Sequence, residues 1–233
     1  QGTKREPEPQ TAFGGKAWAV PGKIEAEDFD EPGYGAGNDS YSDNDASNHA
    51  CTDEGKEAEC TDYRDGTGVD IYKKADGKVV VGYINAGEWL EYTINVKEAG
   101  DYTLFAAVSS GGGSTVSFDL DGAELTGEME VPAGSDANSF DEYNKIKTNV
   151  TLPAGQHVLR FNAVKDWFDI DYVTFVKGKD ATDPGAAEQQ GTTALKYNVN
   201  FEYGKTMQTF KVFNSDGSFL GSVSAYDIHE ACK

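Results

Sequence analysis

The chain is short of basic residues and of reactive motifs, and these scarcities exclude several classes of function. Its 233 residues include 20 Lys and Arg against 40 Asp and Glu, which gives a net charge of -20. Such a surface repels phosphate backbones and anionic lipids, so neither nucleic acid nor a membrane is an expected partner. No apolar run is long enough to span a bilayer. Serine-elbow, phosphate-loop and zinc-spacing motifs are missing as well, which argues against an enzyme.

Cysteine is also scarce, with three residues in the whole chain. Cys51 and Cys60 lie in one polar segment, close enough in sequence to close a small ring. We predict that they form a disulfide, which requires an oxidising compartment. Cys232 is the odd one, next to the last residue, and its pairing stays open.

Glycine and aromatic residues, by contrast, are abundant, with 27 Gly, 12 Tyr and 12 Phe. Apolar and polar residues alternate repeatedly between short turns, which is typical of half-buried strands. The expected strands are 23–27, 69–73, 89–96, 100–109, 115–120, 124–131, 144–152, 156–163 and 170–176. Short strands at this spacing predict an all-β sandwich.

Composition also divides the chain into segments. Residues 1–21 and 179–193 are rich in Pro, Gly and polar residues and are predicted to be linkers around a β domain at 22–178. Residues 194–233 contain alternating apolar residues on both sides of a turn, which predicts a small β-hairpin appendage for export or attachment. Within the domain, the acidic segment 33–66 is predicted to be a long loop.

The most informative stretch is residues 82–92, where Tyr83 and Trp89 flank a Gly-rich turn before an alternating strand. A sugar ring has apolar faces that stack on aromatic rings and a hydroxyl rim that needs hydrogen bonds. Aromatic residues beside a strand end therefore indicate sugar recognition.

The same stretch resembles the signature of the family 6 carbohydrate-binding modules. Further pieces match in order over about residues 23–177, at 24–29, 68–71, 81–83, 126–127, 131–132, 152–157 and 169–173. The resemblance implies a β-jelly roll, a non-catalytic sugar-binding function and secretion as part of a larger protein. It also implies a monomer tethered to a catalytic domain.

In this family two aromatic residues hold a sugar ring and an amide side chain binds its hydroxyls. Tyr83 matches the first aromatic residue, and Phe140 stands where the family usually has Trp. Asp169 stands in place of the amide, so a carboxylate replaces it, and Trp167 beside it is an additional platform. The alternative is that Tyr83 and Phe140 are ordinary core residues.

Some members of the family use a second cleft on the concave face of the sandwich. Trp89 matches its stacking residue, and Asp119 and Asn162 fall near its other positions. The alternative is that Trp89 belongs to the core.

The resemblance further implies a structural calcium site. Glu25 and Glu27 share one face of an expected strand, and Asp171 matches the third carboxylate. Backbone carbonyls near Arg64 would complete an oxygen shell. The alternative is a solvated acidic strand face. A second, weaker calcium pattern, similar to an EF-hand loop, runs over residues 43–54.

We therefore predict a non-catalytic module that directs an attached plant-cell-wall-degrading enzyme to a β-linked polysaccharide such as xylan or a glucan. The expected location is outside the cell or on its surface. Two alternatives remain: a small glycoside hydrolase that uses a pair of carboxylates, and a structural adhesion domain whose sugar clefts have decayed.

Overall fold

The computed structural model describes residues 8–33, 39–44, 46–183, 208–213 and 219–225, the last two ranges by their backbone alone. The chain divides into two compact units, residues 1–185 and residues 186–233. No helix of the described part is long and apolar enough to cross a membrane.

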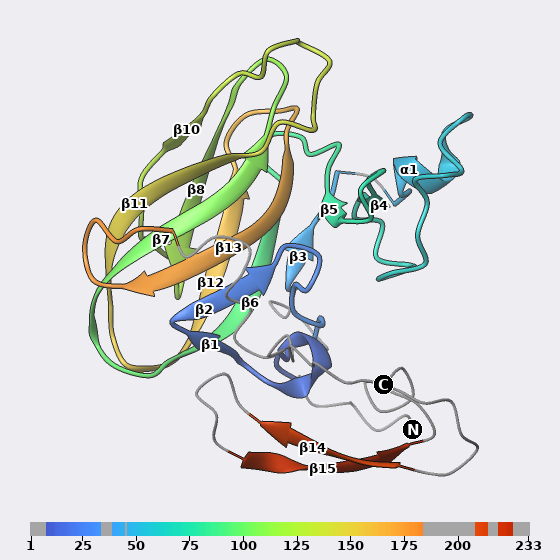
Figure 1. The fold of residues 1–233 in the computed structure, drawn as a ribbon. Coiled ribbons are helices and arrows are strands. Elements are labelled where there is room, and N and C mark those ends of the chain that lie inside the picture. The colour runs from blue at the N-terminus through green and yellow to red at the C-terminus, as the bar shows by residue number, and fades with distance from the viewer. Residues whose placement is uncertain (1–7, 34–38, 45, 184–207, 214–218, 226–233) are drawn as a thin grey trace, which may run out of the picture. The chain divides into compact units, whose positions relative to one another are not determined.

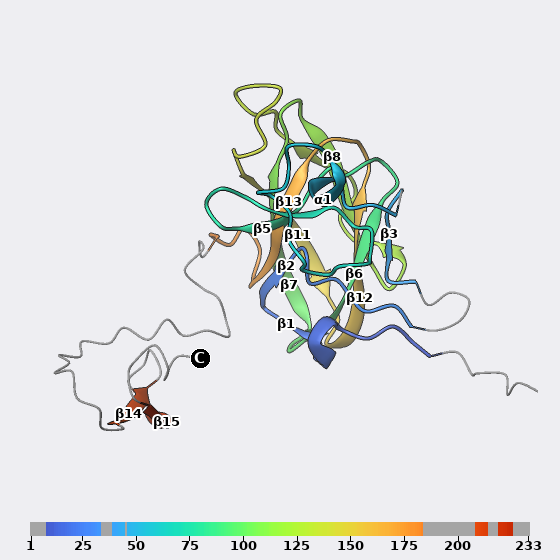
Figure 2. The ribbon, with the colours of Figure 1, turned by 90° about the vertical axis from the view of Figure 1, so that its right-hand side faces the viewer.

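The first unit is a sandwich of two β-sheets that face each other (Figures 1 and 2). One sheet has the order β1 (Trp18–Val20), β6 (Trp89–Val96), β12 (Gly155–Ala163), β8 (Ser114–Leu120) and β10 (Met129–Val131). At its margins β3 (Tyr41–Ser42) pairs with β6, and β9 (Ala123–Glu124) pairs with β8. The other sheet has the order β11 (Asn144–Leu152), β7 (Gly100–Ser109), β13 (Asp169–Lys177), β5 (Val79–Val81) and β4 (Ile71–Lys73), with β2 (Gly22–Glu25) beside β13. This architecture confirms the predicted all-β jelly-roll sandwich.

The core lies between the two sheets and is supplied by alternating residues of each strand. In β6 the buried Leu90, Tyr92 and Ile94 face inward, as the period of two in the sequence requires. The largest fully buried aromatic side chains are Tyr92, Tyr102, Phe29, Phe118, Phe161, Phe168 and Phe175. Complete burial of one large apolar side chain stabilises a fold by about 1.5–3 kcal/mol, so these residues hold the sheets together.

Strand β13 contains a bulge that separates two acidic residues. Its pairing with β7 shifts between Ile170 and Tyr172, so Asp171 is the extra residue. The core-facing side chains are Ile170 before the bulge and Val173 after it, a spacing of three where a regular strand has two. Asp169 therefore lies on the regular part of the strand, whereas the Asp171 carbonyl accepts a hydrogen bond from the backbone that follows β2.

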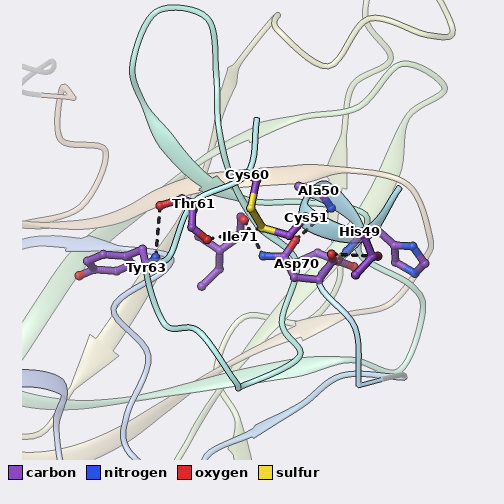
Figure 3. The surroundings of a disulfide bond; sticks show 10 residues. His49, Ala50, Cys51, Cys60, Thr61, Tyr63, Asp70 and Ile71 are labelled. Atoms are coloured by element: carbon purple, nitrogen blue, oxygen red, sulfur yellow. Dashed lines mark hydrogen bonds between the residues drawn. A yellow bond between two sulfur atoms is a disulfide. The ribbon is translucent and has the colours of Figure 1, made fainter. Parts of the chain in front are cut away.

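A disulfide closes the acidic segment beside β4. Cys51 lies in the short helix α1 (His49–Thr52) and is bonded to Cys60, as predicted, with 4.6 Å between the Cα atoms. Figure 3 shows this bond next to the strand that begins at Ile71. Cys60 pairs with Tyr72 in an isolated β-bridge. The segment is thus fastened to the edge of the six-stranded sheet.

Hydrogen bonds also tie α1 to the residues before β4. Asn48 caps the helix through its side-chain oxygen, which accepts from the Ala50 amide at 3.0 Å, and its amide group donates to the Ile71 carbonyl at 2.8 Å. The His49 amide donates to Asp70 Oδ1 at 2.5 Å. Together with β3, this helix shows that residues 33–66 are not wholly loop, and α1 falls inside the EF-hand-like pattern.

Several further boundaries differ from the predictions, and the strand expected at 69–73 begins only at Ile71, as β4. Trp18–Val20, expected to be linker, forms β1 in parallel pairing with β6, because Val20 is an apolar residue fully buried in the core. The strand expected at 124–131 is broken into β9 and β10, since Gly127 adopts a φ of 65° that no strand contains. The strand expected at 23–27 ends at Glu25, so Glu27 follows it in a turn.

The second unit contains β14 (Gln208–Phe213) and β15 (Phe219–Ala225), which pair antiparallel as the predicted hairpin requires. Residues 184–207 and 214–218, which include most of the second predicted linker and the hairpin turn, lie outside the described residues. Cys232 also lies outside them.

Candidate functional site

At one end of the sandwich α1 lies beside β4 (Figure 1). Residues of this region line a pocket of about 790 Å³. The residues that line it include Tyr83, Phe140, Trp167 and Asp169. These are the four residues predicted for the first sugar cleft, and they come from three separate stretches of the chain, because Trp167 and Asp169 are neighbours in sequence. Trp89 does not line this pocket.

Two of the pocket aromatics are held by strained backbone. Tyr83 has a φ of 52° and Trp167 a φ of 65°, a region that side chains other than Gly, Asn and Asp rarely adopt. Hydrogen bonds hold both: Asn85 Nδ2 donates to the Tyr83 carbonyl at 3.1 Å, and Ser110 Oγ donates to the Trp167 carbonyl at 2.7 Å. Strain of this kind costs about 1–3 kcal/mol per residue and occurs mainly where function requires it.

The exposure of the aromatic side chains also fits a binding surface. Trp167 is 61% exposed, which is unusual for so large an apolar group. Tyr83 packs beside a small cluster formed by Ala50, Tyr72 and Val80, apart from the main core. Neither Tyr83 nor Phe140 is among the buried core residues, so the interpretation of both as ordinary core aromatics is wrong.

Asp169 forms the polar centre of the pocket wall. Its Oδ2 atom accepts from the Tyr72 hydroxyl at 2.5 Å and lies 2.8 Å from Lys74 Nζ. Burial raises the pKa of Asp169 above its ordinary value, while Lys74 and Tyr72 act in the opposite direction. The same burial raises the pKa of the Tyr72 hydroxyl, which therefore remains a donor. The carboxylate is thus already bonded on one oxygen.

Lys74 also fixes the loop that carries Phe140. Its Nζ donates to the Phe140 carbonyl at 2.9 Å and lies 3.2 Å from Asp141 Oδ1. The loop approaches the sandwich at Gly111, where an added Cβ would lie 2.1 Å from the Ala137 carbonyl oxygen. Lys74 and the close approach at Gly111 therefore both help to hold the backbone of the loop that carries Phe140.

The remaining pocket residues include several that sequence reasoning missed. Besides Tyr72 and Lys74, the lining includes Lys56, Glu59 and Asn138. Lys56 Nζ lies 3.0 Å from Glu59 Oε1, and both residues belong to the ring closed by the disulfide. The polar residues before the turn at 76–77 were a possible sign that Lys74 is exposed to a ligand. Only the fold, however, brings the end of β4 close to β13.

Trp89 lies at a different place, on the outer face of the seven-stranded sheet. Arg160 covers its ring at 3.9 Å from the centroid, and Arg160 in turn is bonded to Glu91 at 2.6 Å. Asn162 is the cross-strand partner of Trp89 and donates to Asp119 Oδ2 at 3.1 Å. Trp89 is therefore not a core residue, and the structure brings together the three residues predicted for a second cleft.

The residues predicted to bind calcium lie near one another around the end of β2. Burial raises the pKa of Glu27 to about 8, and repulsion from Glu25, Asp28 and Asp171 adds to the effect. Glu27 Oε2 is buried without a hydrogen-bond partner, which is unusual for an acidic oxygen, and an oxygen of this kind would suit a cation. Glu25 is paired with Lys23 at 2.7 Å.

The carboxylates of Glu25, Glu27 and Asp171 do not converge in the way that a metal site requires. Among the described residues, no group of three or more His, Cys, Asp or Glu side chains is arranged to hold a metal ion. The Arg64 carbonyl, predicted as a further ligand, accepts from Thr67 Oγ1 at 2.9 Å. The Arg64 guanidinium lies 4.1 Å from the centroid of the Phe29 ring. Calcium binding stays a prediction.

Comparison with protein families gives one match. The sequence model described as carbohydrate binding module (family 6) matches residues 57–177, just over half of the chain. A search among curated proteins found no match.

Three of the solved structures that are similar to this chain are carbohydrate-binding modules of family 6. The C-terminal module of LamC, a marine laminarinase from Zobellia galactanivorans, shares 27% identity over 47% of this chain and 88% of its own, with a TM-score of 0.43. A Clostridium stercorarium module in complex with cellobiose shares 19% sequence identity. The match covers 70% of this chain and 99% of that module, with a TM-score of 0.48. A module of Cellvibrio mixtus lichenase 5A in complex with cellotriose shares 23% sequence identity. The match covers 68% of this chain and 98% of that module, with a TM-score of 0.45.

Proposed function

Because this chain belongs to the family 6 carbohydrate-binding modules, we propose that it binds a neutral β-linked polysaccharide in the pocket at the α1 end of the sandwich. The observation that carries the proposal is the meeting of Tyr83, Phe140, Trp167 and Asp169 in one pocket of about 790 Å³. A volume in the range of 300–1,000 Å³ is usual for ligand sites.

The proposed mechanism is stacking combined with hydrogen bonding. The rings of Tyr83, Phe140 and Trp167 offer apolar faces for the pyranose rings of the chain, each worth about 0.5–1.5 kcal/mol beyond the buried area. Asp169 accepts hydrogen bonds from the hydroxyl rim. Because hydrogen bonds already hold the Tyr83 and Trp167 carbonyls in the ligand-free protein, little ordering entropy would be lost on binding.

The preferred polymer in this proposal is xylan or a β-glucan. The net charge of -20 disfavours polyanionic polysaccharides at long range. An attached plant-cell-wall-degrading enzyme would then be held at its substrate, because tethering raises the local concentration of the catalytic domain. Secretion or surface location accords with the disulfide between Cys51 and Cys60, a bond that persists in oxidising compartments.

Hydrolysis is the second candidate, and the arrangement of acids at the pocket favours binding over it. A glycosidase needs two carboxylates on opposite sides of the scissile bond. Here each carboxylate of the pocket lining is paired with a lysine: Asp169 and Asp141 with Lys74, and Glu59 with Lys56. The third candidate, a decayed adhesion domain, predicts no preserved pocket, yet the lining of this one includes Tyr83, Phe140 and Trp167.

We also propose a structural calcium ion bound by Glu25, Glu27 and Asp171, with the Arg64 carbonyl as a further oxygen ligand. The buried, unpartnered Glu27 Oε2 supports the proposal. The ion would neutralise the repulsion between these carboxylates and would tie the end of β2 to β13.

The test is an affinity-gel screen of the intact protein against xylan, cellulose-type chains and β-1,3-glucan, with and without chelator. Retarded migration in at least one neutral β-glycan, without release of reducing sugar, supports the proposal. Release of reducing sugar would support the hydrolase. If the protein shows no retardation and releases no sugar, the result supports the decayed adhesion domain.

A further inference from the structure

Lys74 lies where the polar wall of the pocket meets the loop that carries Phe140. Its side chain is 11% exposed, and Nζ contacts three oxygens: Asp169 Oδ2 at 2.8 Å, the Phe140 carbonyl at 2.9 Å and Asp141 Oδ1 at 3.2 Å. An ammonium group has three protons and no lone pair. These three contacts therefore use its whole donor capacity in the ligand-free protein.

The three contacts differ in how easily a ligand can replace them. The Asp169 side chain is 3% exposed, so separating it from its cation would leave a buried charge unpaired. The Phe140 carbonyl belongs to the backbone, so it cannot swing away from Lys74 as a side chain can. Asp141, however, is 83% exposed, and an exposed ion pair contributes little because water and salt screen it. A ligand that enters the pocket can take the place of Asp141 at small cost.

Asp169 retains acceptor capacity as well. Its two hydrogen-bonded contacts, with Tyr72 and Lys74, both end on Oδ2, and an ionised carboxylate can accept about four hydrogen bonds. The pocket wall therefore presents a donor and an acceptor side by side. Those are the two functions of a side-chain amide, the group that the sequence lacks at position 169.

We propose that Lys74 and Asp169 act together as an amide equivalent that binds one hydroxyl group of the sugar. Lys74 donates to the hydroxyl oxygen in place of Asp141, and Asp169 accepts the hydroxyl proton. A hydroxyl group both donates and accepts, so it satisfies both partners at once, whereas a purely donating or purely accepting group does not. The inference rests on the proposed function of this pocket and makes Lys74 a sugar-binding residue.

The test uses titration calorimetry of the intact chain with cellotetraose, xylotetraose and laminaritetraose as probes. Lys74→Met removes the ammonium group and keeps much of the apolar stem. Because a buried group is then left unpaired, affinity for the best-bound probe should fall about tenfold or more. The matched control is Lys78→Met, which removes a lysine that pairs with Asp76 at 2.6 Å at the surface. The control should bind within about twofold of wild type.

The decisive variant is Lys74→Met combined with Asp169→Asn. It replaces the ion pair by a real amide, so affinity should return to within about threefold of wild type. A lysine that only held the loop would not be rescued in this way, because the bond to the Phe140 carbonyl stays lost. Should Lys74→Met fail to fold, the uncharged double variant alone gives the answer. An unchanged Lys74→Met, or a folded double variant that stays about tenfold weaker, overturns the inference while wild-type binding still supports the proposed function. If wild type binds none of the probes, the proposed function fails and this inference fails with it.

Discussion

The imidazole ring of His49 stacks beside the phenol ring of Tyr83, with 5.9 Å between the ring centroids and an angle of 27° between the ring planes. His49 begins the helix that carries Cys51, so the helix that the disulfide anchors packs against Tyr83, the aromatic residue that matches the first stacking position. The same segment contributes Lys56 and Glu59 to the pocket lining. The disulfide between Cys51 and Cys60 should therefore affect sugar binding as well as the stability of the protein.

We expect the variant with both Cys51→Ser and Cys60→Ser to lose stability and affinity together. A crosslink that closes a ring of this size contributes about 2–3 kcal/mol in the chain-entropy model. The melting temperature should fall by several degrees, and calorimetry should show weaker sugar binding. Mass spectrometry of unreduced peptides from wild type should find the two cysteines linked. Wild-type affinity in the variant would show that the ring does not support Tyr83.

Gly82 is expected to be irreplaceable for a steric reason. A Cβ atom built on it would lie 2.4 Å from Asp169 Oδ1 and 2.4 Å from Tyr72 Cε1. Gly82→Ala should therefore push apart the Tyr72–Asp169 hydrogen bond and destabilise the protein by about 1–3 kcal/mol. Chemical denaturation measures this change. The matched control is Gly112→Ala, whose Cβ would meet no heavy atom within 4 Å. Equal stability of the two variants would contradict the packing described at Gly82.

The strands with clear alternation could be predicted from the sequence. β6, β7 and β11 have the bounds expected for them, because β6 and β11 alternate over seven residues and β7 is a long, largely apolar stretch that follows a Gly turn. β5 is three consecutive valines, too short and too uniform for periodicity to reveal. β1 escaped because it lies between Gly- and Pro-containing stretches, and only its pairing with β6 makes it a strand.

The candidate site could be predicted only in part. Tyr83, Phe140 and Asp169 were found by resemblance, and Trp167 by its position beside Asp169. Lys74 could not be found in this way, because its importance depends on how β4 and β5 bring its side chain to β13. The separation of Asp169 from Asp171 was equally hidden, since a bulge has no reliable signal in a single sequence.

Calcium is expected to stabilise the protein without taking part in sugar contacts. A ligand at a hundred times its dissociation constant adds about 2.7 kcal/mol to the free energy of unfolding. Excess EDTA should therefore lower the melting temperature by several degrees, and added calcium should restore it. Glu27→Gln should abolish the response, because it removes one charged ligand of the proposed shell. An EDTA-insensitive melting curve for wild type rules out the site.

Sugar affinity should decline on acidification. Burial raises the pKa of Asp169 above the ordinary 3.8, so this carboxylate gains its proton in a milder acid than usual and then loses its pairing with Lys74. A raised folded-state pKa means that the contribution of Asp169 to stability is greatest below 3.8 and decreases as the pH rises. The loss of affinity is therefore not unfolding caused by this group. Calorimetry between about pH 7 and pH 4 should show the decline in wild type and a flatter profile in Asp169→Asn. A flat wild-type profile would count against Asp169 as an acceptor.

The most direct test of sugar binding at this pocket is titration calorimetry of wild type, Tyr83→Ala and Trp89→Ala with one soluble oligosaccharide that wild type binds. Tyr83→Ala should bind about tenfold more weakly, a loss of about 1.4 kcal/mol, and it should remain folded because Tyr83 lies outside the main core. Trp89→Ala, whose ring is already covered by Arg160, should bind nearly as wild type does. Phe140→Trp should preserve or improve affinity. The opposite result, with full affinity in Tyr83→Ala and lost affinity in Trp89→Ala, would contradict the pocket and assign binding to the outer face of the seven-stranded sheet.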